Sequence, residues 1–299
     1  MIKKLVLYRL PVDFAFGWFS LFVVLQIAFW FCFLYFPLNW LWPGTWERQL
    51  ASPFYVTVGC FVGFHLVVSF FEFVFHRYIL HSVFWKLLQG LARKHREHHR
   101  LTEVREVRAQ LLPNGTAPVR NRYPIVDESQ IESSTFPGWA LVSFWGIFTP
   151  LILVLQAVFP SLPVVIAGYL AVAWSFYLYE VKHAVEHLDY DKFWKRFVAR
   201  PDWVGRTARK IYGFHLMHHS RFRVNQAISG FFGIPVPDLV FGTYFIPEQL
   251  PLPGALVAPD SQDPPPPCRF IQWLDRRVEQ CEQRIRETRK QHARDTLGL

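Results

Sequence analysis

The chain alternates between long apolar stretches and strongly polar ones. Residues 14–46, 53–71 and 133–179 contain no Asp, Glu, Lys or Arg. A helix that crosses a bilayer needs about 20 apolar residues, so each stretch is long enough to span a membrane. The third is long enough to do so twice, and Pro160 and Pro163 divide it. We therefore expect an all-α integral membrane protein with four transmembrane helices in two hairpins, over about 14–36, 53–75, 138–159 and 164–182.

The positions of Lys and Arg predict how these spans are oriented. Ten Lys or Arg lie between residues 76 and 137, and Lys3, Lys4 and Arg9 precede the first span. The two connectors on the other side hold only Arg48. Because cytoplasmic loops are enriched in Lys and Arg, we expect both termini to be cytoplasmic. The polar segments, about 76–137 and 183–260, then form a cytoplasmic helical cap.

The chain carries a net charge of +9. Most of this charge comes from the Lys and Arg of the predicted cytoplasmic segments and from a basic C-terminal tail. The charge therefore indicates anionic lipid headgroups as neighbours rather than nucleic acid.

The C-terminal tail differs in composition from the rest. Four prolines, Pro264–Pro267, precede a highly charged stretch with a helical stripe of apolar residues at 270, 274, 278, 281 and 285. Such a helix can pack on the cap, lie on the membrane surface or self-associate. The sequence leaves these three alternatives open.

Ten of the twelve histidines fall into four clusters. Two clusters have the form H-x-x-H-H. Positions i, i+3 and i+4 of a helix share a face, so we expect each to present three imidazoles to a single point. The other two are pairs, one before each H-x-x-H-H. The clusters are His76 and His81; His95, His98 and His99; His183 and His187; and His215, His218 and His219.

These histidines predict a metal centre in the cap. Neutral imidazole is a good ligand for iron, zinc and copper, and ten of them exceed the roughly four that one ion uses. We therefore expect all ten to hold two metal ions. His76 and His81 lie about 140° apart around an ideal helix, so either the second span ends between them or they bind different ions. His65 lies three turns deeper, and we expect it to be a hydrogen-bonded histidine of the bundle.

Two carboxylates lie at helical spacing from a histidine. Glu72 is one turn deeper than His76, and Glu180 precedes His183 by three residues. A carboxylate that accepts an imidazole N–H fixes the tautomer that binds metal, so we expect both to orient these ligands. The alternative is an ion pair with a base such as Arg77 or Lys182, because an unpaired charge near the bilayer is costly.

The succession H-x4-H, H-x-x-H-H, H-x-x-x-H and H-x-x-H-H at the cytoplasmic ends of the spans resembles the membrane fatty acid hydroxylase and sterol desaturase superfamily. The resemblance continues past His218-His219 to Asn225 and then to Asp238-Leu-Val-Phe-Gly-Thr243, similar to the family's N-x-G and D-x-x-F-G-T signature. The family's glycine after Asn225 is replaced by Gln226-Ala227. The resemblance implies a supporting role for Asn225 beside the metal ligands. We expect Asp238 to position the segment after the last cluster.

The resemblance covers about residues 55–246 and implies three segments. Residues 1–52 form an N-terminal segment with the first span. Residues 53–250 form the catalytic domain, with three spans and the cap. Residues 251–299 form the Pro-rich linker and charged C-terminal helix.

The resemblance implies a di-iron, O2-dependent oxygenase that hydroxylates an unactivated C–H bond of a lipid, such as a fatty acyl chain or a sterol. A desaturase with the same site is the alternative. Zinc can replace the two iron ions in purified protein, because it outcompetes ferrous iron at nitrogen ligands. The chain contains no cytochrome b5-like H-P-G-G, so a separate ferredoxin, cytochrome b5 or reductase would donate electrons.

The other expected partners are the lipid substrate and the bilayer, and a homo-oligomer is compatible with the sequence. The bacterial inner membrane and the endoplasmic reticulum both fit the topology. The C-terminal sequence Asp295-Thr-Leu-Gly-Leu contains no retrieval motif, which favours the bacterial inner membrane.

Other functional classes fit the histidine pattern less well. A metal transporter places ligands along a path within the membrane, usually with carboxylates. A metal transporter or storage protein therefore remains the alternative from a different class. A bis-histidine haem protein does not need H-x-x-H-H. A membrane zinc protease would need H-E-x-x-H, and His95-Arg-Glu-His has the wrong order.

Overall fold

The computed structural model describes residues 16–82 and 89–297, with side chains described up to residue 291. Lys3, Lys4, Arg9 and the side chain of His292 lie outside the described residues. The described chain is mostly helical and divides into two compact units. Unit 1 consists of the described residues within Met1–Glu72, Val126–Leu188 and Ile228–Ile234; unit 2 consists of those within Phe73–Ile125, Asp189–Ala227 and Pro235–Leu299.

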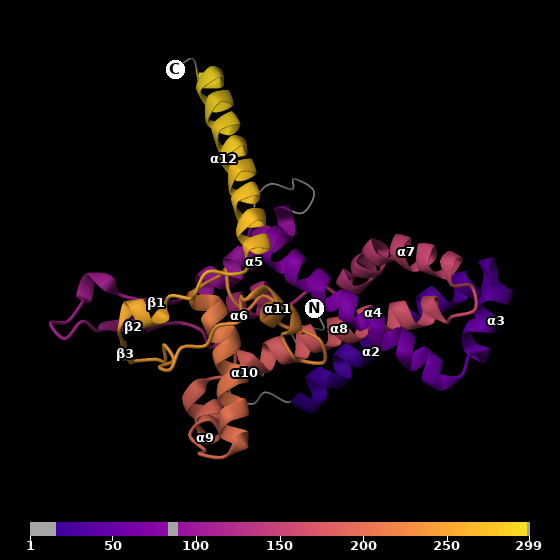
Figure 1. The fold of residues 1–299 in the computed structure, drawn as a ribbon, viewed down its shortest axis with the longest axis horizontal. Helices are drawn as coiled ribbons and strands as arrows, with labels where there is room; N and C mark the ends of the chain where they lie inside the picture. Colours follow the sequence, from indigo (N-terminus) through magenta and orange to yellow (C-terminus); the bar gives the residue numbers. More distant parts are fainter. Residues whose placement is uncertain (1–15, 83–88, 298–299) are drawn as a thin grey trace. The chain divides into compact units, whose positions relative to one another are not determined.

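Figure 1 shows the order of the elements along the chain. Those that lie in unit 1, or begin there, are α2 (Phe16–Leu41), α3 (Pro43–Ala51), α4 (Phe54–Phe75), α6 (Glu128–Ser134), α7 (Ala140–Val158) and α8 (Val164–Glu186). The helices of unit 2 are the π-helix η1 (His76–Leu80), α5 (Gln89–Leu101), η3 (Arg108–Gln110), the π-helix η4 (Tyr190–Trp194), α9 (Lys195–Val198), α10 (Trp203–Ser220), α11 (Val236–Phe241), η5 (Pro259–Gln262) and α12 (Arg269–Leu297). Its strands are β1 (Val104–Glu106), β2 (Ala117–Asn121) and β3 (Leu256–Val257).

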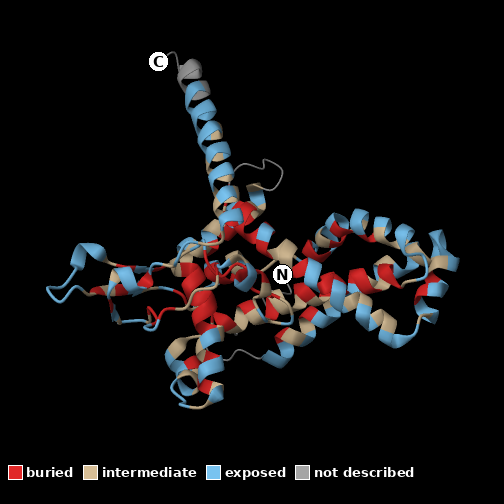
Figure 2. Ribbon diagram, in the orientation of Figure 1, coloured by how far each residue is buried: buried red, intermediate tan, exposed pale blue. Residues whose placement is uncertain are grey.

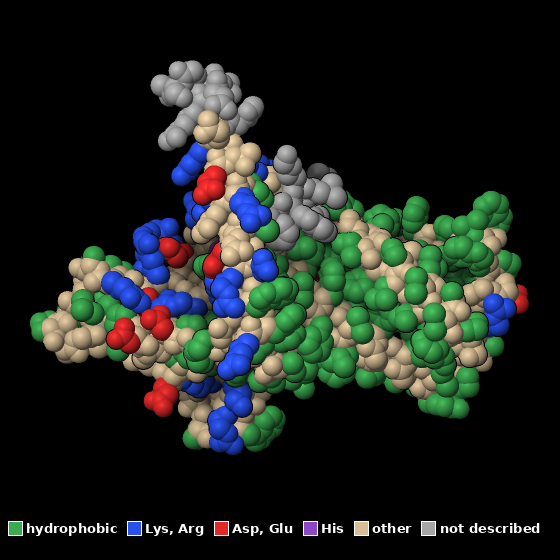
Figure 3. All heavy atoms as spheres, turned by 45° about the horizontal axis from the view of Figure 1, so that its top comes forward, with side chains coloured by type: hydrophobic (Ala, Val, Ile, Leu, Met, Phe, Trp, Pro, Cys, Tyr) green, Lys and Arg blue, Asp and Glu red, His purple; other side chains and the backbone are tan. Residues whose placement is uncertain are grey.

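Four helices of the described chain are long and apolar enough to cross a bilayer, and they lie where the sequence predicts the four spans. They are Phe16–Leu41, Phe54–Leu80, Ala140–Val158 and Val164–Glu186. Their outer side chains are large and apolar: Trp40 is 81% exposed and Phe36 is 69% exposed. Figure 3 shows hydrophobic side chains gathered over these helices. A surface of this kind is costly in water and favourable in hydrocarbon, so the four helices indicate a membrane protein.

A few polar contacts join the helices of unit 1. The Ser20 and Tyr177 hydroxyls lie 2.7 Å apart. His65 is fully buried, with Nδ1 at 3.0 Å from the Ser175 hydroxyl and Nε2 accepting a hydrogen bond from the Phe232 backbone N–H at 3.0 Å. The prediction that His65 is a hydrogen-bonded bundle histidine is therefore confirmed.

Unit 2 contains a small antiparallel sheet in the order β1-β2-β3. The sequence predicts no strands, and the stretch 101–135 in particular reads as irregular, so the all-α prediction is wrong in this detail. Alternate residues of β1 are buried, Val104 and Glu106, but the strand has only three residues. A period-2 pattern this short cannot be recognised in a sequence. The prediction of a mostly helical fold holds.

Helix α12 packs on the rest of unit 2 through its first turns. Ile271 is buried, and Asp275 forms an ion pair of 2.6 Å with Arg77. Glu279 pairs with Arg223 at 2.5 Å. Beyond these contacts the helix is mostly exposed (Figure 2). Of the three predicted alternatives, packing against the protein itself is thus confirmed for the beginning of the helix.

The two units are discontinuous in sequence, whereas the three predicted segments follow chain order. The chain leaves unit 1 after Glu72, returns at Val126 and returns again for Ile228–Ile234. The predicted segments 1–52, 53–250 and 251–299 rest on the family resemblance and stay a prediction.

Candidate metal centre

Five histidines of unit 2 converge on one point, and we name them group A: His76, His81, His95, His99 and His218. Their ligand nitrogens all lie within 4.8 Å of one another, and each ring is buried or half-buried. The Nε2 atom of His95 lies 2.9 Å from that of His76 and 3.1 Å from those of His81 and His99. The Nε2 atom of His218 lies 3.1 Å from that of His99 and 3.3 Å from that of His81. Group A is therefore a compact set of five imidazole nitrogens.

A local change of helix type brings His76 and His81 together. Helix α4 continues directly into the π-helix His76–Leu80. A π-helix forms i→i+5 hydrogen bonds, so residues five apart lie above one another. The two rings stack with centroids 5.2 Å apart, and both belong to group A. The span ends at Leu80, so the predicted alternative in which it ends between the two histidines is confirmed, and they do not serve separate points.

A second set, group B, comprises His98, His215 and His219 in unit 2. All three are buried, and their ligand nitrogens lie within 4.8 Å of one another. The Nε2 atoms of His215 and His219 are 3.1 Å apart. The Tyr123 ring packs against both, with centroids 5.8 and 5.2 Å away.

The two H-x-x-H-H motifs divide their ligands between the groups. On α5, His95 and His99 belong to group A and His98 to group B; on α10, His215 and His219 belong to group B and His218 to group A. The prediction that each motif aims three imidazoles at one point is therefore wrong. Residues i and i+4 differ by about 40° around a helix, whereas i+3 and i+4 differ by about 100°. Each helix thus gives a pair to one group and a single ring to the other.

His183 and His187 end helix α8 in unit 1. Both are buried, and their ring centroids are 4.7 Å apart. The backbone N–H of His187 donates to the His183 carbonyl and closes the last turn. The i, i+4 spacing therefore places both rings on one side of the helix end, as the sequence predicts.

Backbone and hydroxyl oxygens set the tautomer of three rings. His76 Nδ1 lies 2.6 Å from the Gln226 carbonyl, and His218 Nδ1 lies 2.9 Å from the Val224 carbonyl. Since a carbonyl only accepts, each Nδ1 carries the proton and Nε2 presents its lone pair to group A. His219 Nδ1 lies 3.0 Å from the Thr102 hydroxyl, which itself donates to the His98 carbonyl at 2.6 Å. The same reasoning therefore directs His219 Nε2 into group B.

The geometry fits a metal ion bound by nitrogen. With metal–nitrogen bonds of about 2.1 Å, neighbouring ligand nitrogens in an octahedral or tetrahedral shell are about 3.0–3.4 Å apart. Neighbouring Nε2 atoms of group A are 2.9–3.3 Å apart, and all its ligand nitrogens lie within 4.8 Å of one another. Burial, and then neighbouring histidines, lower the pKa of His81, His95 and His218 well below the usual range. The rings are therefore neutral at pH 7, and a cation between them would relieve the repulsion of their lone pairs.

Asp238 and Asn225 hold the segment that follows α10. Asp238 is fully buried and accepts hydrogen bonds from the Gln226 and Ala227 backbone N–H groups, both at 2.8 Å, and from the Thr243 hydroxyl at 2.6 Å. The positioning role predicted for Asp238 is thereby confirmed. Asn225, with φ of 54°, donates to the Phe214 and Phe245 carbonyls and accepts from the Phe245 N–H. It therefore supports the backbone next to His215 rather than an imidazole.

The prediction that Glu72 orients His76 is wrong. Glu72 accepts hydrogen bonds from the Ser229 N–H at 2.7 Å, the Ser229 hydroxyl at 2.5 Å and the Gly230 N–H at 3.0 Å. His76 Nδ1 is bonded to Gln226 instead. Of the alternative bases, Arg77 pairs with Asp275 rather than with Glu72, whereas the charge of Lys182 acts on Glu72. The buried backbone N–H groups of a turn bind this carboxylate instead, and helical spacing alone does not reveal it.

Glu180 accepts a hydrogen bond from the Phe136 backbone N–H at 2.9 Å. Its predicted role toward His183 stays a prediction. Lys182, the alternative base, pairs with the buried Glu186 at 2.7 Å and also donates to the Ile228 carbonyl.

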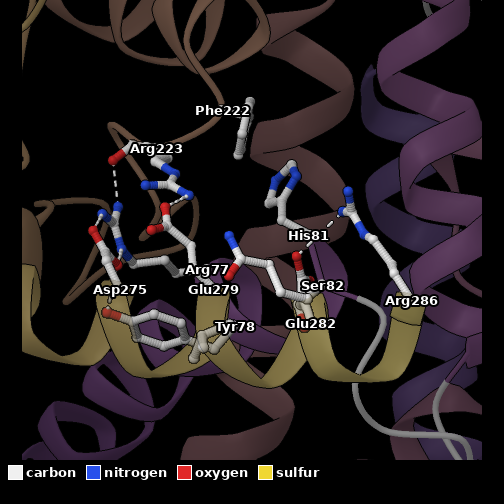
Figure 4. A pocket seen from close by; sticks show the side chains of 12 residues that line it. Arg77, Tyr78, His81, Ser82, Phe222, Arg223, Asp275, Glu279, Glu282 and Arg286 are labelled. Carbon is white, nitrogen blue, oxygen red and sulfur yellow. Dashed lines mark hydrogen bonds and ion pairs between the residues drawn. The ribbon is translucent and has the colours of Figure 1, made fainter. Parts of the chain in front are cut away.

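A cavity of about 300 Å³ in unit 2 leads to His81. Figure 4 shows His81 and Phe222 facing the α12 residues Glu279 and Glu282, with Arg223 beside them. The cavity thus gives one ligand of group A access to the surface of unit 2.

Searches of this chain against protein family models, curated proteins and solved structures found no match.

Proposed function

We propose that this protein is a membrane-bound, O2-dependent di-iron oxygenase that hydroxylates an unactivated C–H bond of a lipid, such as a fatty acyl chain or a sterol. The observation that carries the proposal is group A: five imidazole nitrogens at ligand spacing, beginning where an apolar span ends. Only a metal site needs so many neutral histidines in one place.

The ten histidines supply the ligands of two ions. Group A holds one ion through His76, His81, His95, His99 and His218. Group B would hold the second through His98, His215 and His219, and we expect His183 and His187 to bind metal as well, as the sequence predicts. The carbonyls of Gln226 and Val224 and the Thr102 hydroxyl keep three of these rings in the tautomer that binds metal.

Bound iron would supply the oxidation by dioxygen that side-chain acids and bases cannot perform on a C–H bond. The protein's own part is to hold the rings, exclude water and present the substrate. Burial of the histidines keeps them dry and neutral. The apolar spans let a hydrocarbon chain approach from the bilayer, where such substrates partition.

The remaining parts of the proposal follow from topology and from the superfamily resemblance. The metal centre faces the cytoplasm, where a separate ferredoxin, cytochrome b5 or reductase donates electrons. Both the bacterial inner membrane and the endoplasmic reticulum fit this topology. A desaturase with the same ligands is the alternative reaction.

A metal transporter or storage protein is the candidate from a different class. The three carboxylates within the described spans engage other partners: Glu72 binds a backbone turn, Glu180 accepts from the Phe136 N–H and Glu186 binds Lys182. These contacts favour an enzyme over an ion path.

The test is lipid analysis of cells that express the chain, with and without oxygen, combined with metal analysis of the purified protein. A hydroxylated lipid that requires oxygen, together with about two metal ions per chain, is the expected result. A new double bond would instead indicate the desaturase. Metal uptake by proteoliposomes without any change in lipids would overturn the enzyme proposal in favour of transport.

A further inference from the structure

A second cavity, of about 360 Å³, lies in unit 1. It is formed by α3, the end of α2, the end of α7 and the beginning of α8. Gln49 on α3 ties these parts together: its amide donates to Gln156 at 2.9 Å and accepts from the Val165 N–H at 3.0 Å. Pockets for small ligands occupy about 300–1,000 Å³, so this cavity is large enough to hold part of a ligand.

The cavity is far from the histidines along the same helix. Val165, which lines it, and His183 are separated by 18 residues of α8, or about 27 Å of helix rise. The cavity is therefore separate from the histidines, and the inference does not depend on the proposed oxygenase. Because α3 connects two spans, the cavity lies at the end of the bundle opposite His183.

The chemistry of the lining is amphipathic. Leu38, Leu153, Ala157 and Val165 give it an apolar part, and Arg48 is its only charged residue. Arg48 is also the only Lys or Arg between residues 16 and 76. Its guanidinium donates to the Thr45 hydroxyl at 3.0 Å, and the structure records no ion pair for it among the described residues. The cavity therefore offers a cation next to apolar surface.

Trp46 adds an independent observation. It lines the cavity, is only 8% exposed, and its indole N–H has no hydrogen-bond partner in the described part of the chain. A buried N–H without a partner is costly, and a bound acceptor removes that cost. Tryptophan and arginine at the end of a transmembrane helix are also the residues that meet lipid headgroups.

We infer that this cavity binds one anionic glycerophospholipid. Arg48 pairs with the headgroup phosphate, for which a guanidinium is the best side-chain partner. The Trp46 N–H donates to a headgroup or ester oxygen. An acyl chain lies against Leu153 and Ala157 and continues along the exposed apolar surface of the helices. The lipid stabilises the connection of α3 to the α7–α8 turn.

The test is native mass spectrometry of the full chain released from nanodiscs that contain equal amounts of phosphatidylglycerol and phosphatidylcholine. The wild type should retain about one phosphatidylglycerol. Arg48→Gln should reduce that retention about tenfold, as expected for the loss of a charged hydrogen bond. Ala157→Phe, which fills the cavity and keeps the charge, should also reduce it. Arg284→Gln, which removes an exposed arginine of α12, should leave retention unchanged.

A thermal unfolding experiment provides the second measurement. Added phosphatidylglycerol should raise the Tm of the wild type and of Arg284→Gln but not that of Arg48→Gln, so a variant of low yield still gives an answer. Equal retention in the wild type and Arg48→Gln would overturn the inference. Equal retention of phosphatidylcholine in the wild type would do the same, since it would indicate only the general lipid belt.

Discussion

Asp238 and His76 are connected through a single residue, Gln226. The Gln226 N–H donates to the Asp238 carboxylate at 2.8 Å, and the Gln226 carbonyl accepts from His76 Nδ1 at 2.6 Å. A carboxylate 162 positions away in the chain therefore fixes the carbonyl that orients a group A histidine. The D-x-x-F-G-T segment thus supports a group A histidine through one intervening residue.

Replacing Asp238 should weaken metal binding in group A. Asp238→Ala removes the acceptor for two backbone N–H groups, and loss of such supporting partners commonly costs about 10–100-fold in metal affinity. Asp238→Asn keeps one acceptor oxygen and should lose less metal affinity. Competition with a chelator measures the affinity, and Asp191→Asn, at an exposed ion pair, is the control. Unchanged affinity in Asp238→Ala would refute the connection.

Removing one histidine from each group should separate the two ions. His81→Ala should lower metal content by about one ion per chain through group A, and His98→Ala should do so through group B. We expect His218→Ala to abolish lipid oxidation as well. Metal content per folded chain is the measurement, and Lys210→Ala, an exposed residue on α10, is the control. A single variant that loses both ions would indicate one shared site.

The metal-free protein should lose stability below pH 6.5. Burial lowers the pKa of His81, His95 and His218 in the folded chain. Below the ordinary pKa of about 6.5 the unfolded chain binds protons that the folded chain does not, so stability falls as pH falls. The slope is about 1.4 kcal/mol per pH unit for each such histidine. Tm measured with chelator from pH 8 to 5 tests this, and His218→Gln should give a shallower slope.

Glu72 should matter for folding more than for metal. It holds the Ser229–Gly230 turn of unit 1, so Glu72→Ala leaves two buried N–H groups without an acceptor. We expect the yield of folded protein to fall and the metal content per folded chain to stay constant. The yield of Glu72→Gln should fall less, and the yield of Glu47→Ala, which changes an exposed residue of α3, should not fall. Metal loss at normal yield would restore a role for Glu72 beside the ligands.

The orientation of the spans can be tested with single cysteines in a cysteine-free chain. An impermeant thiol reagent added to intact cells should label a cysteine at Gly44, between the first two spans, and miss one at Leu111, in the exposed β1–β2 connection. Leu111 is 56% exposed and suits this purpose better than Gly115, whose φ of 77° strains any side chain. Labelling at Leu111 alone would reverse the predicted topology.

The sequence by itself determined the four spans and the histidines that can bind metal. Both are properties of local pattern: charge-free stretches of bilayer length, and imidazoles repeated at helical spacing. The end of α4 was only half predicted, because a five-residue spacing does not say that a π-helix will bring His76 above His81.

Only the tertiary structure decided which histidines belong to group A or group B, and which groups form hydrogen bonds with the side chains around them. Each H-x-x-H-H splits between groups A and B because α5 and α10 meet at both points, and helical periodicity cannot say which neighbour faces which ring. His76 and Glu72 bond mainly to backbone groups of distant turns, which have no residue-type signature. The three short strands could not be predicted either. They are too short to show a periodic pattern, and pairing between β1, β2 and β3 stabilises them.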